Sequence, residues 1–273
     1  MQKKMVKMFC IANTYRNKSF SCFLASVFEN SARFWQIPLY PKIYTRSQVQ
    51  QPMLRPKSTL RYTPDLEEIA EEFIEKKIIL KRDPNTNEVK EDFLDDLYKW
   101  SLESVTCLAL NARLGCLESN ILEDSHQMKI VRGVSEIFSN SQTLDSGLQI
   151  WRFLPSPKLN QFEQGYKTFR DMCVIYIEQA IKEIKEKKIK ISSNEVDIDE
   201  GDPSMLELFF ERGVDEATAI VMALDMMFAG VDTSSHTSAF IMYHLAKHPH
   251  VQERLYKEIS TELPDKVTYN RYL

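Results

Sequence analysis

Apolar side chains recur along most of this chain at steps of three and four residues, the spacing of one face of an α-helix. The clearest stripe runs from Leu159 to Ile184. No segment shows sustained apolar–polar alternation, the strand pattern, so the sequence predicts an all-α fold. Weaker stripes predict further helices from Thr63 onward and over about 91–113, 123–140, 204–211 and 250–262.

Two of these helices carry local boundary signals. Thr63 and Pro64 precede an acidic first turn, which predicts Thr63 as the N-cap and Pro64 as the first helical residue. Gly115 follows the apolar stripe of the 91–113 segment, and we expect it to end that helix.

A longer helix is predicted from about Asp215 to Lys247. It is apolar nearly all round, a composition typical of a helix buried in the middle of a large protein. The chain has no uninterrupted run of about 18 apolar residues, the length that suggests a membrane span.

Segment 229–234 interrupts this apolar helix with a glycine, a carboxylate and two hydroxyls. Glycine costs about 1 kcal/mol relative to alanine in a helix interior, and a buried Asp232 needs partners. Thr233 can bond back to the carbonyl oxygen of Ala229 and bend the helix. A bend beside small residues opens a groove for a ligand, into which the acid and the alcohol can relay protons. The alternative is a polar patch that faces solvent or another helix.

Glycine is scarce in this chain. The seven glycines are widely separated, so the sequence contains no GxGxxG, Walker A or GxSxG motif. Classical dinucleotide-binding, P-loop and α/β-hydrolase functions are therefore excluded. Hydrophobic residues make up 43% and charged residues 27% of the chain, a composition typical of a soluble globular protein.

Charge is unevenly placed along the chain. Residues 1–64 carry eleven Lys or Arg and one acid, which gives +10, and residues 65–273 carry −14. A basic front end is typical of a targeting segment, a nucleic-acid arm or a membrane-surface patch. The first 28 residues lack acids and a compact apolar block, and they are similar in composition to a mitochondrial transit peptide.

The cysteines and one run of histidines are candidate metal-binding or disulfide-forming residues. The five cysteines contain no CxxC pair, which disfavours a disulfide framework or a zinc ribbon, and the last of them is Cys173. His244, His248 and His250 have a spacing that could bind zinc, as in a metal-dependent hydrolase, but Pro249 breaks the helix between them. We expect solvated histidines and no metal site.

Segment 228–235, Phe-Ala-Gly-Val-Asp-Thr-Ser-Ser, resembles the oxygen-activating central helix (the I helix) of the cytochrome P450 family. That family's pattern is (Ala/Gly)-Gly-x-(Asp/Glu)-Thr-(Thr/Ser). Segments that resemble the following helix, and others that resemble the mitochondrial branch of animal and particularly arthropod members, are 245–249, 252–259, 51–56, 100–105 and 114–117. The likeness covers about residues 46–273.

The resemblance implies roles for individual residues. Asp232 and Thr233 would be the catalytic acid–alcohol pair that supplies protons for cleavage of dioxygen. Ala229 and Gly230 would lie against the heme. The remaining roles would fall to Asp225 and Phe228, beside the substrate, and to Arg46, on a heme propionate. The Arg46 motif is only half present, because Lys42 stands where the family has tryptophan.

Two family features have no match in this sequence. The family holds its heme iron through a cysteine thiolate on a glycine-rich loop near the C-terminus. No cysteine follows Cys173, and no arginine has a glutamate three residues before it, as the family's Glu-x-x-Arg pair requires. The resemblance thus implies a partial P450 fold. The part represented is the helical one, without most of the β-rich N-terminal portion and without the heme-ligand region.

The sequence therefore predicts a heme-thiolate monooxygenase family member that oxidises a lipophilic small molecule. It would use O2 and electrons from a ferredoxin-type iron–sulfur protein, associate peripherally with the mitochondrial inner membrane, and bind no nucleic acid. The endoplasmic reticulum membrane is the alternative location. Residues 1–45 would be a transit peptide or an artefact of gene prediction, and 46–273 the partial catalytic domain. The alternative function is a noncatalytic helical relic or interaction protein.

One prediction follows from the missing cysteine. Expressed alone, residues 1–273 should show no carbon-monoxide-induced Soret band of the thiolate-heme type, because no cysteine occupies the family's ligand position. A difference spectrum of the reduced, heme-supplemented protein measures this. Appearance of the band would contradict the inference.

Overall fold

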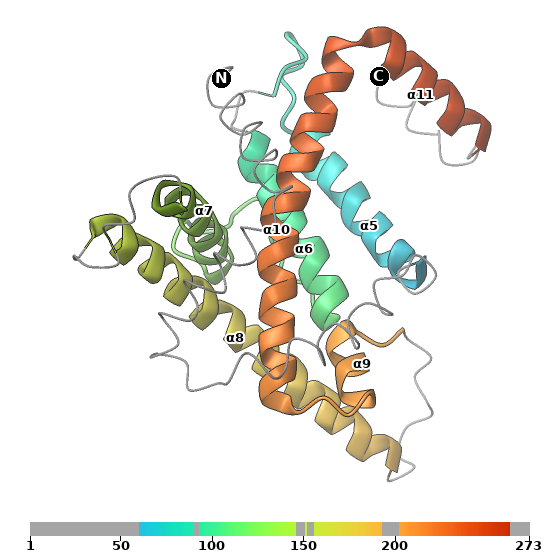
Figure 1. Cartoon of the computed structure of the whole chain (residues 1–273). Coiled ribbons are helices and arrows are strands. Elements are labelled where there is room, and N and C mark those ends of the chain that lie inside the picture. Colours follow the sequence, from blue (N-terminus) through green and yellow to red (C-terminus); the bar gives the residue numbers. More distant parts are fainter. Residues whose placement is uncertain (1–59, 90–92, 146–150, 152–155, 193–201, 263–273) are drawn as a thin grey trace.

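The computed structural model describes residues 60–89, 93–145, 151, 156–192 and 202–262, and these residues are mostly helical (Figure 1). Within them β pairing is limited to one isolated bridge between Arg82 and Val89. The predicted Arg46 and the segment 1–45 lie outside the described residues. The elements in chain order are η1 (Leu60–Tyr62), α5 (Thr63–Phe73), η2 (Ile74–Ile79), α6 (Phe93–Leu110), α7 (His126–Asp145), α8 (Pro157–Ser192), α9 (Met205–Glu211), α10 (Glu216–Lys247) and α11 (Pro249–Glu262).

Helix α5 begins where the sequence predicts, but its cap differs. Thr63 is the first helical residue and Tyr62 occupies the N-cap without a side-chain hydrogen bond. The predicted capping role of Thr63 is therefore wrong. The 3₁₀ turn η1 runs directly into α5, so the helical backbone starts before Thr63 could act as a cap.

The end of α6 also differs from the prediction. Asn111 adopts the left-handed conformation, with φ 54°, and its N–H donates to the carbonyl oxygen of Cys107 at 2.8 Å. Asparagine tolerates this conformation better than most residues, so it ends the helix. Gly115, the predicted terminator, is also left-handed, with φ 71°, but it lies in the loop that follows.

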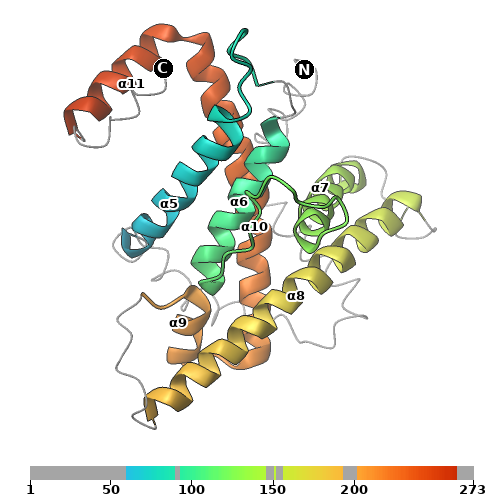
Figure 2. The ribbon, with the colours of Figure 1, turned by 180° about the vertical axis from the view of Figure 1, so that it is seen from behind.

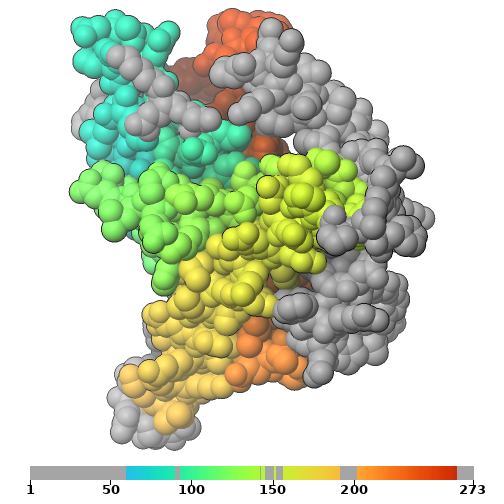
Figure 3. Space-filling view, turned by 90° about the vertical axis from the view of Figure 1, so that its left-hand side faces the viewer, coloured from blue at the N-terminus to red at the C-terminus, as the bar shows by residue number. Residues whose placement is uncertain are grey.

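Helix α10 passes through the centre of the molecule, with α6 alongside it (Figures 1 and 2). Helices α7 and α8 lie on one side of this pair and α5 on the other. Figure 3 shows α8 running diagonally across one face of the molecule, in yellow. The main hydrophobic core lies among α6, α7, α8, α9 and α10, and includes the fully buried Phe169, Phe209 and Met222.

Helix α10 lies in the middle of the molecule, as its composition predicts, but only part of its surface is buried. Met222, Met227 and Val231 are buried, whereas Asp225, Ala229 and Thr233 are exposed. By length and composition α10 could also cross a membrane, but 44% of its most apolar window is buried inside the protein. A core helix of a soluble domain has the same properties.

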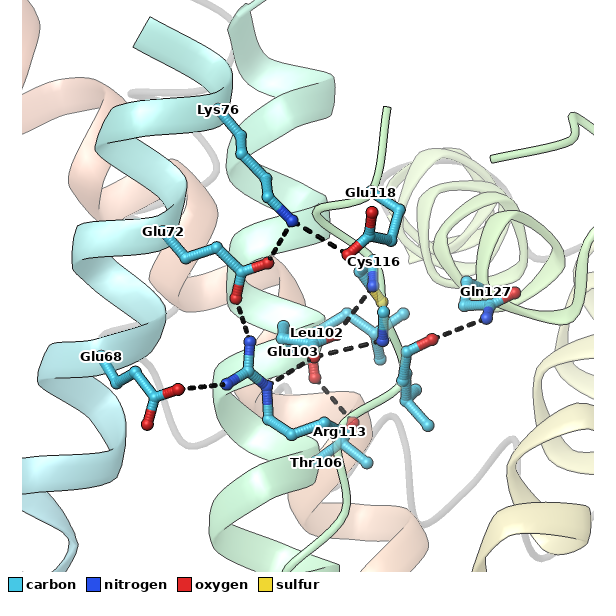
Figure 4. Close-up of polar contacts among 12 residues, drawn as sticks. Glu68, Glu72, Lys76, Leu102, Glu103, Thr106, Arg113, Cys116, Glu118 and Gln127 are labelled. Atoms are coloured by element: carbon cyan, nitrogen blue, oxygen red, sulfur yellow. Dashed lines mark hydrogen bonds and ion pairs between the residues drawn. The ribbon is translucent and has the colours of Figure 1, made fainter. Parts of the chain in front are cut away.

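The loop between α6 and α7 is fixed by a buried carboxylate, Glu103 (Figure 4). Glu103 is fully buried, and it accepts hydrogen bonds from the backbone N–H groups of Gly115 at 3.2 Å and Cys116 at 2.8 Å. The Nε of Arg113 donates a third bond to it at 2.8 Å. A buried charge is stable only when it is paired and hydrogen-bonded, and Glu103 meets that condition.

Arg113 extends this network to α5. Its guanidinium also contacts Glu72 and lies 3.7 Å from Glu68. Lys76 bonds both Glu72, at 2.8 Å, and Glu118, at 2.9 Å. Burial opposes the charged form of Arg113, but its bonds to these carboxylates outweigh that effect and raise its pKa. The network thus connects α5, α6 and the loop after α6.

We predict that Glu103→Gln lowers the free energy of unfolding by about 3 kcal/mol, since removal of one partner of a buried pair is strongly destabilising. Urea denaturation measures the change. The matched control is Glu118→Gln, whose side chain is 65% exposed and which should cost about 0–1 kcal/mol. Equal losses in the two variants would contradict a central role for Glu103.

Candidate active site

One face of α10 is open in this chain, and we call the row of Asp225, Ala229 and Thr233 the open face. These residues are four apart, so they line one side of the helix, and all three are exposed. The row combines a carboxylate, a methyl group and a hydroxyl. A ligand can reach this part of α10 in the described structure.

Thr233 bonds back along the helix, as the sequence predicts. Its hydroxyl donates to the carbonyl oxygen of Ala229 at 2.6 Å. This bond uses the hydroxyl proton and fixes the side chain, while the oxygen atom stays able to accept a proton or a hydrogen bond.

Asp232 lies on a different side of the helix from Thr233. Asp232 is only 9% exposed, and its Oδ1 accepts a hydrogen bond from the Tyr98 hydroxyl of α6 at 2.7 Å. The Nδ1 atom of His236, one turn further along α10, lies 3.3 Å from the same oxygen. The predicted acid and alcohol are therefore consecutive in sequence, but the acid is enclosed between α10 and α6 while the alcohol is exposed.

Gly230 also faces α6. A Cβ atom at this position would lie 2.6 Å from Cγ2 of Val105, so only glycine fits without a shift of the Val105 side chain or of the helices. Ala229 belongs to the open face and Gly230 to the helix interface. One turn along, the Ser235 hydroxyl contacts the Ser101 hydroxyl at 2.9 Å. We call these contacts, together with Tyr98–Asp232, the α6–α10 seam.

Phe228 forms the centre of an aromatic cluster. Its ring stacks on Phe138 of α7, with centroids 5.0 Å apart, and meets the edge of Phe169 of α8 at 5.6 Å. Rings in this offset and edge-to-face geometry attract one another beyond simple burial. Helices α7 and α8 thereby contribute an apolar wall beside the central helix.

The family model of cytochrome P450 matches residues 43–271, which is most of the chain. The chain belongs to the cytochrome P450 family. Among curated proteins, it is 34% identical over 223 residues to the probable mitochondrial cytochrome P450 301a1 of Drosophila melanogaster, covering 82% of this chain and 39% of that protein. The probable mitochondrial cytochrome P450 12a5 of the same fly is also 34% identical, over 221 residues.

Solved structures agree on the fold. A cytochrome P450DA heme domain superposes with a TM-score of 0.56 at 17% identity, covering 79% of this chain and 43% of that domain. A triple mutant of the same domain gives a TM-score of 0.59 at 16% identity. The expected partial P450 fold is therefore confirmed. The chain spans about two-fifths of the length of the curated relatives named above.

The members of the P450 family are monooxygenases, and membership implies a heme cofactor. The open face fits such a group, because a flat ligand can approach the small Ala229 side chain there. The described cysteines do not fit as the axial thiolate. Cys107, Cys116 and Cys173 are buried, and burial raises the pKa of Cys107 to about 11 and the pKa values of the other two well above the ordinary value.

The three histidines at the end of α10 lie at the surface, in agreement with the predicted solvated state. His244, His248 and His250 are all exposed, and neighbouring rings are about 6 Å apart, at 6.3 and 6.1 Å between centroids. In the part of the chain that the structure describes, no group of three or more His, Cys, Asp or Glu side chains could hold a metal ion.

Sequence reasoning missed Tyr98 and His236. His236 carried a signal, because residues four apart on a helix share a face, and that places it next to Asp232. Tyr98 carried none, since it is 134 residues away in the chain.

The seam gives a test of the close helix approach. Gly230→Ala should lower the free energy of unfolding by about 1–2 kcal/mol, because overpacking against Val105 exceeds the helix-propensity gain of alanine. In a Val105→Ala background the same substitution should cost at least about 1 kcal/mol less, as expected for residues in contact. Strictly additive losses in a denaturant double-mutant cycle would contradict the contact.

Proposed function

We propose that this chain provides the central helix and its supporting scaffold in a mitochondrial-type P450 monooxygenase. The enzyme would oxidise a lipophilic small molecule with O2 and with electrons from a ferredoxin-type iron–sulfur protein. The observation that carries the proposal is the exposed Thr233 hydroxyl, held by the Ala229 carbonyl next to the enclosed Asp232. The mitochondrial names of the relatives support the location, for which we propose the inner-membrane surface.

Each residue of the site would have a separate role. When bound, heme would supply the activation of dioxygen. Ala229 and Gly230 would leave space for the heme beside α10. Ala229 would do so through its short side chain, and Gly230 by allowing α10 to pack closely against α6. Thr233, fixed by its bond to Ala229, would hold a proton at its hydroxyl oxygen. After that proton is donated, Asp232 would supply another to Thr233. Arg46 would bind a heme propionate.

The substrate class follows from the surroundings of the open face. Phe228, with the rings of Phe138 and Phe169 behind it, offers an apolar wall, and aromatic rings of this kind favour lipophilic ligands. Asp225, two turns before Thr233 on the open face, would border the same ligand. We propose a largely apolar substrate that carries a polar group within reach of Asp225.

The test uses the full-length enzyme that contains this chain, loaded with heme and reconstituted with ferredoxin and its reductase. Thr233→Ala should lower product formation per electron consumed by about 10²-fold, the lower end of what a positioned proton donor contributes. Ser234→Ala, an exposed hydroxyl one residue further along, is the matched control and should behave as wild type. Equal coupling in Thr233→Ala and Ser234→Ala would contradict the assigned role.

A further inference from the structure

The enclosed Asp232 carboxylate has two side-chain partners, and neither belongs to the P450 motif that predicted it. The Tyr98 hydroxyl donates to Oδ1 at 2.7 Å, and Nδ1 of His236 lies 3.3 Å from the same atom. The two partners also contact each other, edge to face, with ring centroids 5.7 Å apart. One oxygen of Asp232 is thus held from α6 and from the next turn of α10.

His236 connects this carboxylate to solvent. The His236 side chain is 25% exposed, whereas that of Asp232 is 13% exposed. Both polar contacts of His236 with described residues are made by Nδ1, to the carboxylate and to the Asp232 carbonyl oxygen at 3.0 Å. The His236 side chain is thus held at Nδ1, and a quarter of its surface reaches solvent.

We propose that His236 is a positioning residue that carries protons from solvent to Asp232, while Tyr98 fixes the carboxylate oxygen that receives them. In this step the Nδ1–H bond of an imidazolium breaks and an O–H bond forms at Asp232. The ring is left neutral with its proton at Nε2. A ring flip then turns the bare Nδ1 toward solvent, where it takes a proton from water and the ring becomes imidazolium again, now with Nε2–H toward Asp232. The proposal rests on the proposed function, because it assigns a source for the protons that Asp232 passes to Thr233.

The electrostatics of the site favour a protonated His236 ring beside Asp232. Burial lowers the pKa of His236, but the hydrogen bond and the negative charge of Asp232 outweigh burial, so its pKa is raised overall. The titratable groups that face the ring are Asp232 on α10 and Tyr98 on α6. Among the described residues, Asp232 is the charged group that acts on His236. The imidazolium is consequently stabilised by the group to which it would donate.

The first experiment needs no heme and uses residues 1–273. In an NMR titration of the five histidines, Asp232→Asn should lower the pKa of His236 and leave the other four titrations unchanged. Glu253→Gln, which removes an exposed carboxylate from α11, is the control. This variant should leave the titration of His236 unchanged. A His236 pKa unchanged by Asp232→Asn would overturn the coupling.

A second measurement covers the case in which Asp232→Asn fails to fold. Because the pKa of folded His236 is raised, its stabilising effect is fully present below the unfolded pKa of about 6.5 and lost as pH rises through the folded value. The stability difference between wild type and His236→Gln should therefore be larger at about pH 5.5 than at about pH 9. Equal differences at the two pH values would overturn the coupling.

The functional arm uses the heme-loaded full-length enzyme. His236→Gln should lower kcat about tenfold or more without changing KM, since it removes a proton donor but no substrate contact. The loss of kcat in His236→Gln, relative to wild type, should grow as the pH falls, because the wild-type His236 ring then becomes charged. If the wild-type enzyme is active and His236→Gln leaves kcat unchanged, the relay would be overturned but the proposed function would not. A wild-type enzyme without oxygenase activity would overturn the proposed function, and the ion pair seen by NMR would then be structural only.

Discussion

The close approach of α6 and α10 determines the arrangement of the rest of the site. A glycine at position 230 lets the two helices come together until Val105 lies where a side chain would otherwise be. That approach encloses Asp232 beside Tyr98 and brings Ser235 to Ser101. It also decides which residues remain exposed, because a helix pressed against its neighbour on one side leaves the opposite row to a ligand. The chemistry of Ala229 and Thr233 therefore depends on an interface to which they do not belong.

Two buried carboxylates stabilise the structure in different ways. Glu103 is paired with a guanidinium and two backbone amides, and it fixes a loop. Asp232 is paired with a phenol and an imidazole, both of which can exchange protons. Fixed donors suit a structural role, because they hold the carboxylate and the loop in one arrangement. Partners that can exchange protons are what the proton-transfer role proposed for Asp232 requires.

The parts of this structure that sequence could predict are the local ones. The stripe from Leu159 to Ile184 gave α8 correctly, and the bond from Thr233 to Ala229 depends only on residues one turn apart. The ends of helices are harder to predict. Asn111 can adopt the left-handed conformation too, and it ends α6 before Gly115 is reached. The partner of Asp232 on α6 could not be found, since no pattern in one sequence links residue 98 to residue 232.

The α6–α10 seam also has a kinetic consequence. The network around Glu103 joins residues within one continuous stretch of chain, from Glu68 to Glu118, so it closes short loops. The contact of Tyr98 with Asp232 closes a loop of 134 residues, and the entropy lost on closure rises with the logarithm of loop length. Topology of this kind favours early formation of the α5–α6 unit and late docking of α10. Asp232 then loses its hydrating water only when α10 docks, at a stage when its phenol partner on α6 is already in place.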